Sequence, residues 1–246
     1  MELALPIRYI SGGLLGDFIH NLSIVNENYL KSGRKGIIYI RNTPVYFRLG
    51  LDRAFLDTYP FISIQPYIHE YKIHDGEPYD IDLDTWRGSH LLYNTNLHNI
   101  YKSTYDVEWA THPWLHISIV NPTFVNTVFI CCSIHRYPHT NFQELFEKHG
   151  INPETVQFMT QSMNEYEFFK ERIGLDIPMY MPPTLEDMVI AVNSCALFIG
   201  NMSSPLTYAY ALHKKNITLH NFHDWCGDDV FFHGLEMVVP NITFSP

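Results

Sequence analysis

The chain has 246 residues and a formal net charge of −10 at pH 7, with 46% hydrophobic and 17% charged residues. This hydrophobic content supports a folded core and excludes a disordered chain. The acidic balance argues against a broad electrostatic surface for nucleic acid or an anionic membrane, so we expect no nucleic-acid partner. We find no signal-peptide pattern and no run of about 20 apolar residues that would form a transmembrane segment. None of the four cysteines belongs to a CxxC pair, so we expect reduced thiols and a cytoplasmic protein.

The first half of the chain begins with a strand, a helix and a second strand. Apolar β-branched runs predict strands over 7–10 and 36–40, and the stretch 17–31 between them reads as a helix. Alternation of apolar and polar residues predicts two more strands, over 67–74 and 79–83. The rest of the middle of the chain is irregular.

The second half alternates strands and helices more regularly. We expect caps at Asn164, Thr184 and Ser204, with Pro205 at the first helical position. The predicted helices cover 141–149, 164–173 and 184–193, with a fourth starting at 204. The predicted strands cover 128–132, 156–159, 179–181, 196–199, 216–219 and 238–239.

This rhythm predicts an α/β protein whose parallel sheets are covered on both faces. It starts twice, near residues 7 and 128, which indicates two Rossmann-like domains that meet near 115–125. Ligands of such sheets bind beyond the carboxyl ends of the strands. We therefore look for the site in the residues that follow each strand.

The first candidate site is the glycine-rich loop 11–17, directly after the first strand. Gly13 and Gly16 allow a close approach to the backbone, and Asp17 at the helix mouth can accept a proton from a substrate hydroxyl. Asp17 can equally serve only to complement the helix dipole. The glycine spacing does not give G-x-G-x-x-G, and Arg41 rather than an acidic residue follows the second strand.

The second candidate site lies at the strand-to-helix junctions of the second half. Asn201, Ser203 and Ser204 would bring hydroxyl and N–H groups to one helix N-terminus, where a pyrophosphate can bind. Arg136 can add a fork of donors to a phosphate. The alternatives are an ordinary serine cap and a solvated arginine. A nucleotide pocket would include Ser133, Thr160, Gln161, Ser162, Met181 and Pro182.

Two segments resemble the heptosyltransferase-like family of GT-B glycosyltransferases. Residues 200–212, GNMSSPLTYAYAL, are similar to the family's donor-phosphate motif, approximately Gly-Asn-Asp-Ser/Thr-Gly-Pro-Met-His before an Ala-rich helix. Residues 16–22, GDFIHNL, are similar to its first helix, which opens with Gly-Asp. The chain departs from the donor motif at Met202, Ser204 and Thr207, which leaves the heptose donor open.

The resemblance implies a GT-B fold, with two Rossmann-like domains facing each other across a cleft. Residues 1–120 would bind the acceptor and 121–246 the nucleotide-sugar donor. The implied reaction is an inverting glycosyl transfer that needs no cofactor or metal, with Asp17 as general base. Ser203, Ser204, Asn201 and Arg136 would hold the donor phosphates. The acceptor side would comprise Gly13, Gly16, His20, Arg41, Trp86 and Arg87.

Several other interpretations stay open. Asp80, Asp82 and Asp84 form two overlapping D-x-D patterns, which hold a divalent metal in metal-dependent glycosyltransferases, but an alternating strand gives the same pattern. The residues 223–226, HDWC, suggest zinc or simply a turn. A non-catalytic nucleotide- or glycan-binding module is the rival of another class, and a nicotinamide oxidoreductase is more distant. The donor, the acceptor and the oligomeric state are not specified by the sequence.

Overall fold

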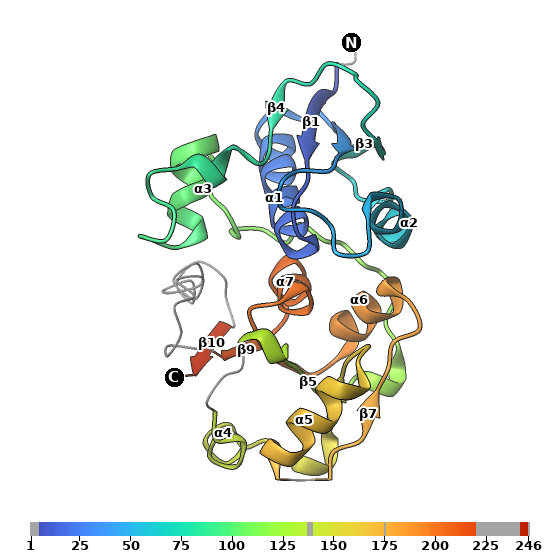
Figure 1. Cartoon of the computed structure of the whole chain (residues 1–246), viewed down its shortest axis with the longest axis vertical. Coiled ribbons are helices and arrows are strands. Elements are labelled where there is room, and N and C mark those ends of the chain that lie inside the picture. The colour runs from blue at the N-terminus through green and yellow to red at the C-terminus, as the bar shows by residue number, and fades with distance from the viewer. Residues whose placement is uncertain (1–4, 137–139, 175, 220–241, 246) are drawn as a thin grey trace. The chain divides into compact units, whose positions relative to one another are not determined.

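The computed structural model describes residues 5–136, 140–174, 176–219 and 242–245. The chain divides into two compact units, the first running up to His116 and the second beginning at Ile117 (Figure 1). Each unit is built around one parallel sheet, and each is described by itself below. No helix within the described ranges is long and apolar enough to cross a membrane.

The first unit contains a four-stranded parallel sheet in the order β3-β2-β1-β4. The register pairs Ile7 of β1 with Gly36 of β2, and Tyr9 of β1 with Ile81 of β4. The elements of this unit are β1 (Ile7–Ser11), α1 (Leu15–Ser32), β2 (Gly36–Ile40), α2 (Leu51–Ile62), β3 (Ile68–Ile73), β4 (Ile81–Asp82), the 3-10 turn η1 (Thr85–Gly88) and α3 (Leu97–Tyr105).

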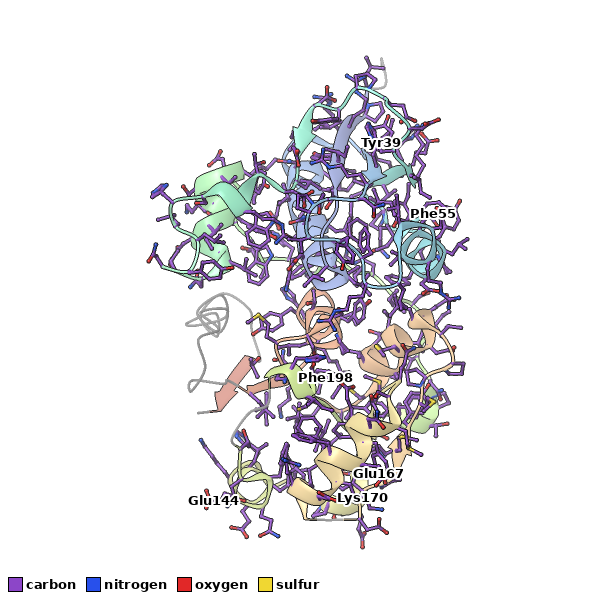
Figure 2. The ribbon with its side chains drawn as sticks, viewed as in Figure 1. Tyr39, Phe55, Glu144, Glu167, Lys170 and Phe198 are labelled. Carbon is purple, nitrogen blue, oxygen red and sulfur yellow. The ribbon has the colours of Figure 1, made fainter. Side chains whose placement is uncertain are left out.

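Helices α1 and α2 cover the same face of this sheet. Gly36 allows α1 to pack closely, because a Cβ there would lie 2.6 Å from Val25 Cγ1. On the same face, the Tyr71 ring stacks with Phe18 of α1 at 5.9 Å, and the Tyr71 hydroxyl lies 2.7 Å from Thr58 Oγ1 of α2. Phe55 of α2, labelled in Figure 2, completes this cluster 5.1 Å from Tyr71. The hydrophobic core of the unit therefore lies between the sheet and these two helices.

The opposite face of the first sheet differs from the expectation that helices cover both faces. The chain runs from β3 to β4 through residues 74–80 without a helix. This loop crosses the second face, because Tyr79 contacts Arg41 and His74 there. The face carries polar side chains, including Arg8 and Lys72. A short connection with charged residues beneath it replaces the second helical layer.

The second unit contains a six-stranded parallel sheet in the order β10-β9-β8-β5-β6-β7. Val128 at the start of β5 pairs with Val156 of β6 on one side and with Leu197 of β8 on the other. The elements are the turn η2 (Pro122–Phe124), β5 (Val128–Cys131), the turn η3 (Ile134–Arg136), α4 (Phe142–His149), the turn η4 (Pro153–Thr155), β6 (Val156–Met159), α5 (Met163–Ile173), β7 (Met179–Tyr180), α6 (Leu185–Ser194), β8 (Leu197–Asn201), α7 (Ser204–Ala211), β9 (Asn216–Leu219) and β10 (Ile242–Ser245).

Helices cover both faces of the second sheet (Figure 1). Ile130 and Ile199 point into a cluster with Phe142 and Phe146 of α4 and with Phe169 of α5. The other face is covered by α6 and α7, which pack against each other, and by η2, whose Phe124 contacts Phe129 of β5 at 5.1 Å. Phe198, labelled in Figure 2, is fully buried. The parallel sheet with two helical layers is confirmed for this unit.

Two predicted helix caps are wrong by one or two residues. Helix α5 begins at Met163 and is capped by Ser162, whose Oγ accepts from the Glu165 N–H, so Asn164 lies inside the helix. Helix α7 has Ser203 in an extended conformation at its N-cap, which puts Ser204 at the first helical position. The cap at Thr184 is confirmed, as a reciprocal capping box with Asp187. The predicted strand at 238–239 lies outside the described residues.

Candidate functional site

The loop between β1 and α1 is held in a conformation that needs glycine at two successive positions. A Cβ on Gly12 would lie 2.6 Å from the Arg41 carbonyl oxygen, a backbone atom that cannot move aside easily. Gly13 has a φ of 91°, and a Cβ there would lie 2.5 Å from Arg87 Nη2. The glycines therefore admit neighbouring protein groups at the carboxyl end of the sheet, and Gly16 follows in the first turn of α1.

Asp17 lies in the first turn of α1 and forms an ion pair with Arg87. Arg87 Nη2 donates to Asp17 Oδ2 at 2.6 Å, and both side chains are about one quarter exposed. Burial lowers the pKa of Arg87, but attraction by Asp17 and Asp84 outweighs it and leaves the pKa above its ordinary value. The guanidinium is therefore charged at all working pH values. The structure brings together Gly13, Asp17 and Arg87.

The Arg87 guanidinium packs against the ring of Trp86. Its Cζ lies 4.5 Å from the centre of the indole ring, in cation–π geometry. Trp86 is buried, packs on Tyr101, and donates its backbone N–H to the Tyr105 hydroxyl at 3.1 Å. Trp86 was expected to touch an acceptor sugar, but it is only 3% exposed and its ring lies under Arg87.

A buried polar network lies behind the Asp17 loop. The Asn21 amide nitrogen donates to Ser11 Oγ at 3.0 Å, and its oxygen accepts from the Tyr101 hydroxyl at 2.7 Å. The same amide nitrogen lies 3.4 Å from Asp84 Oδ1. Burial, followed by repulsion from Asp82, raises the pKa of the Asp84 carboxyl. This network ties α1, α3 and the end of β4 to one another.

The carboxylates of the D-x-D segment bind arginines from β1 and from the residue that follows β2. Asp80 pairs with Arg8 at 2.8 Å. Arg41 contacts Asp82 at 2.6 Å and Asp84 at 3.6 Å. In the part of the chain that the structure describes, no three His, Cys, Asp or Glu side chains come together as a metal site.

His20 does not reach the acceptor side. It is 4% exposed and packs against the rings of Trp109 and Trp114 at 5.4 and 6.2 Å. Burial lowers its pKa to about 3, so the imidazole is neutral. His112 has its Nδ1 2.8 Å from the buried carboxylate of Glu27. Both histidines have structural partners in the core of the first unit.

In the second unit, Asn201 connects the ends of β5 and β8. Its side chain is 1% exposed, and its amide bonds both main-chain polar groups of Ser133 at 2.9 Å. An amide used in this way shapes the loops and does not itself face a ligand. We had expected Asn201 to contact donor phosphates directly, so the structure changes its assignment.

Helix α7 begins shortly after Asn201. Ser203 Oγ donates to the Asn201 carbonyl at 3.0 Å, and the Thr207 hydroxyl donates to the Ser203 carbonyl at 3.3 Å. Ser203 and Ser204 are both partly exposed. Their hydroxyl groups and the first N–H groups of α7 thus lie together at the carboxyl edge of β8. Arg136 lies in η3 after β5, but its side chain lies outside the described part, as do residues 223–226.

The remaining nucleotide-pocket candidates follow β6 and β7. Thr160 Oγ1 donates to Glu165 Oε2 at 2.8 Å and accepts from the Ser162 N–H at 3.0 Å. Gln161 reaches across to the Pro182 carbonyl at 3.5 Å. Met181 is 47% exposed, whereas Pro182 is buried. The structure therefore brings the predicted segments 160–162 and 181–182 together.

Sequence reasoning missed the partners of these groups. Asn21, Tyr101 and Glu165 all bond candidate site residues or the loops that carry them. Asn21 lies 80 residues from Tyr101 in the chain, so no local pattern joins them. Glu165 could have been found from the sequence, since it directly follows the predicted cap position of a helix.

Solved structures share this fold. The chain is similar to the dodecameric iron-containing heptosyltransferase TibC of enterotoxigenic E. coli in complex with ADP-D-beta-D-heptose, with a TM-score of 0.60 and 12% identity over 98% of the chain. It is also similar to E. coli heptosyltransferase WaaC with ADP-2-deoxy-2-fluoro heptose (TM-score 0.60, 11% identity, 98% coverage) and to a family 9 glycosyl transferase from Veillonella parvula (TM-score 0.58, 14% identity, 97% coverage).

The chain spans 63% of TibC, 92% of the WaaC chain and 86% of the Veillonella chain. No protein-family model matches the sequence, and no curated protein matches it. The GT-B fold expected from the two motifs, with a parallel α/β sheet in each of two units, is confirmed. At 11–14% identity this similarity describes the fold alone.

Proposed function

We propose that this protein is a glycosyltransferase that moves a sugar from a nucleotide-sugar donor to a hydroxyl group of a glycan or glycoconjugate acceptor. The observation that carries this proposal is the Asp17 carboxylate. It lies in the first turn of α1, directly after the glycine loop at the carboxyl end of β1, and Arg87 binds its Oδ2. The fold shared with glycosyltransferase structures supports the same function.

On the acceptor side, Asp17 would act as general base. A hydroxyl group must lose its proton as its oxygen attacks the anomeric carbon, and a carboxylate beside the hydroxyl can take that proton. We assign acceptor binding to residues 1–120, with Gly13, Gly16 and Arg41 around the base. Direct attack of this kind inverts the configuration at the anomeric carbon.

On the donor side, the N-terminus of α7 would bind the pyrophosphate. Ser203 and Ser204 offer hydroxyl groups there, and the helix dipole favours the negative charge that grows on the leaving diphosphate. Arg136 would add a positive charge, so the transfer is proposed to be metal-independent. We assign donor binding to residues 121–246, with Asn201 at the end of β8 fixing the loop that follows β5.

The nucleotide would lie along the segments 160–162 and 181–182. Exposed Met181 offers an apolar surface for a base, and Ser133 and Gln161 offer polar groups, whereas the Thr160 hydroxyl is buried and bonded to Glu165. TibC and WaaC were solved with ADP-heptose compounds, which supports a nucleoside-diphosphate sugar here. The replacements at Met202, Ser204 and Thr207 keep the sugar itself open.

A thermal-shift screen over nucleotide sugars, followed by measurement of nucleoside diphosphate release, tests the proposal. Bound donor raises the melting temperature, and Asp17→Asn should abolish release while leaving that shift intact. Asp57→Asn is the matched control, because Asp57 also pairs with one arginine of the same unit at 2.8 Å but lies on α2 and not at the carboxyl end of β1. Unchanged release in Asp17→Asn would remove Asp17 as the base.

Two further arms separate the rival functions. Ser204→Ala combined with Arg136→Ala should weaken the donor-induced shift, and undiminished donor affinity would contradict the phosphate site. Release should persist in EDTA. A loss of release in EDTA would favour the metal-dependent reaction of the Asp80–Asp84 segment, and donor binding without turnover would favour a binding module.

A further inference from the structure

Arg87 holds one oxygen of the Asp17 carboxylate. Nη2 lies 2.6 Å from Oδ2, and in the described ranges Arg87 is the group that hydrogen-bonds this carboxylate. A carboxylate bound at one oxygen by a fixed donor loses its freedom to rotate, and its second oxygen then faces a defined direction. A general base needs this kind of fixed geometry, because proton transfer requires an approach of about 2.6–3.2 Å.

The arginine is itself immobilised. Its guanidinium stacks on the indole of Trp86 at 4.5 Å, and the backbone of Trp86 is bonded to the Tyr105 hydroxyl. Trp86 is buried and contacts Tyr101 of α3. Packing on these buried aromatic side chains therefore restricts the movement of the Arg87 side chain.

The glycine loop is fitted to this pair. A Cβ on Gly13 would lie 2.5 Å from Arg87 Nη2 and 3.7 Å from Asp17 Oδ2. Any side chain at this position would thus displace the arginine from the carboxylate. Arg87 occupies the space that a side chain at position 13 would need. The glycine therefore allows the ion pair to form.

We propose that Arg87 is a positioning residue for Asp17, and this inference rests on the proposed transferase function. In the transfer step the acceptor O–H bond breaks, its proton moves to Asp17 Oδ1, and the acceptor oxygen forms a bond to the anomeric carbon. The bond from that carbon to the diphosphate oxygen breaks, and its electron pair leaves with the diphosphate. Arg87 acts through Asp17 and does not contact the acceptor sugar.

Donor hydrolysis distinguishes positioning from acceptor binding, because water then replaces the acceptor. Release of nucleoside diphosphate is measured with ADP-glucose, UDP-glucose and ADP-heptose. Arg87→Met should lower kcat for hydrolysis about tenfold to a hundredfold with the donor KM unchanged, as expected when a reacting group is misplaced. Arg87→Lys should recover part of the loss. An arginine that only binds the acceptor sugar would leave hydrolysis unchanged, and that result would overturn the proposal.

Arg8→Met is the matched control. Arg8 also binds one aspartate, Asp80, at 2.8 Å in the same unit, but near the start of β1. Arg8→Met should leave the rate of donor hydrolysis equal to that of the wild-type protein. An equal loss of kcat in Arg8→Met and Arg87→Met would mean that any lost ion pair disturbs the unit, and would also overturn the proposal.

A measurement without turnover separates this inference from the proposed function. In nitrogen-15 NMR spectra of the arginine side chains, rotation about the Arg87 Cζ–Nη bonds should be slow in the wild-type protein and fast in Asp17→Asn. Fast rotation in the wild type would overturn the proposal even if the protein is a transferase. Slow rotation with no release from any donor would instead count against the proposed function alone.

Discussion

The side-chain amide of Asn201 pairs with both main-chain polar groups of Ser133. Its Oδ1 accepts from the Ser133 N–H and its Nδ2 donates to the Ser133 carbonyl, each at 2.9 Å. The two residues are 68 positions apart; Asn201 ends β8, and Ser133 lies in the loop after the neighbouring strand β5. One buried side chain thus holds both loops at this edge of the sheet in a single arrangement.

Replacing Asn201 by aspartate should destabilise the second unit. The carboxylate keeps the acceptor but loses the donor, and it places a charge against the Ser133 carbonyl in a buried position. We expect a loss of about 2–3 kcal/mol in the free energy of unfolding, measured by denaturant titration. Asn152→Asp is the control, because Asn152 is exposed and uses only its oxygen, which accepts from the Glu154 N–H. Equal losses in the two variants would show that the paired hydrogen bonds between Asn201 and Ser133 do not stabilise the unit.

Gly13→Ala should cost both stability and activity. Its φ of 91° is strained for alanine, and the added methyl group would also meet Arg87. Gly76 has a similar φ of 87°, but nothing lies within 4 Å of its Cβ position. Both variants should lose about 1 kcal/mol from backbone strain. Only Gly13→Ala should lose more than this and slow donor hydrolysis; indistinguishable variants would show that the loop tolerates the methyl group.

The cap of α5 gives a direct comparison of two neighbouring residues. Ser162→Ala removes the oxygen that accepts from Glu165 N–H, and we expect a loss of about 1 kcal/mol. Asn164→Ala changes an exposed side chain inside the first turn, and its effect should stay within about 0.5 kcal/mol. Thermal or denaturant unfolding measures both. The reverse order would restore Asn164 as the cap.

His20 should make the protein sensitive to acid. Burial lowers its folded-state pKa to about 3 from an ordinary value of 6.5, so the unfolded chain binds a proton that the folded chain does not. Stability is therefore lost as pH falls from about 6.5 towards 3, by at most about 1.4 kcal/mol per pH unit. The slope of unfolding free energy against pH in this window should flatten in His20→Gln. Exposed His69 is the control, and His69→Gln should keep the wild-type slope.

Local patterns predicted most of the elements, and their failures have physical reasons. The strands β2 and β5 are continuous apolar runs, and Thr184 carries its capping box within four residues. Helix α2 was missed because it exposes Leu56 and Tyr59 and contains Pro60, which obscures its apolar stripe. Helix α3 has only nine residues, and its cap Asn96 lies in a polar stretch.

The candidate site was predictable in position but not in its internal bonding. Asp17 follows the first strand, and that order alone places it at the carboxyl edge of the sheet. Its partner Arg87 lies 70 residues away, in a turn whose position depends on how β4 joins the sheet. Arg87 could be named as an acceptor contact from its residue type, but its contact with Asp17 required the fold.

The pairing of Asp80 and Asp82 with arginines has a consequence for how the first sheet forms. Strand β4 is only two residues long, with Ile81 opposite Tyr9 and Asp82 opposite Ile10. A slip of one residue would turn these carboxylates towards the core and expose Leu83, which is now fully buried. Arg8 and Arg41 thereby penalise misaligned edge pairing during folding. These ion pairs align the shortest strand of the unit. Salt screens such pairs, so the fraction of chains that fold with β4 misaligned should rise with ionic strength.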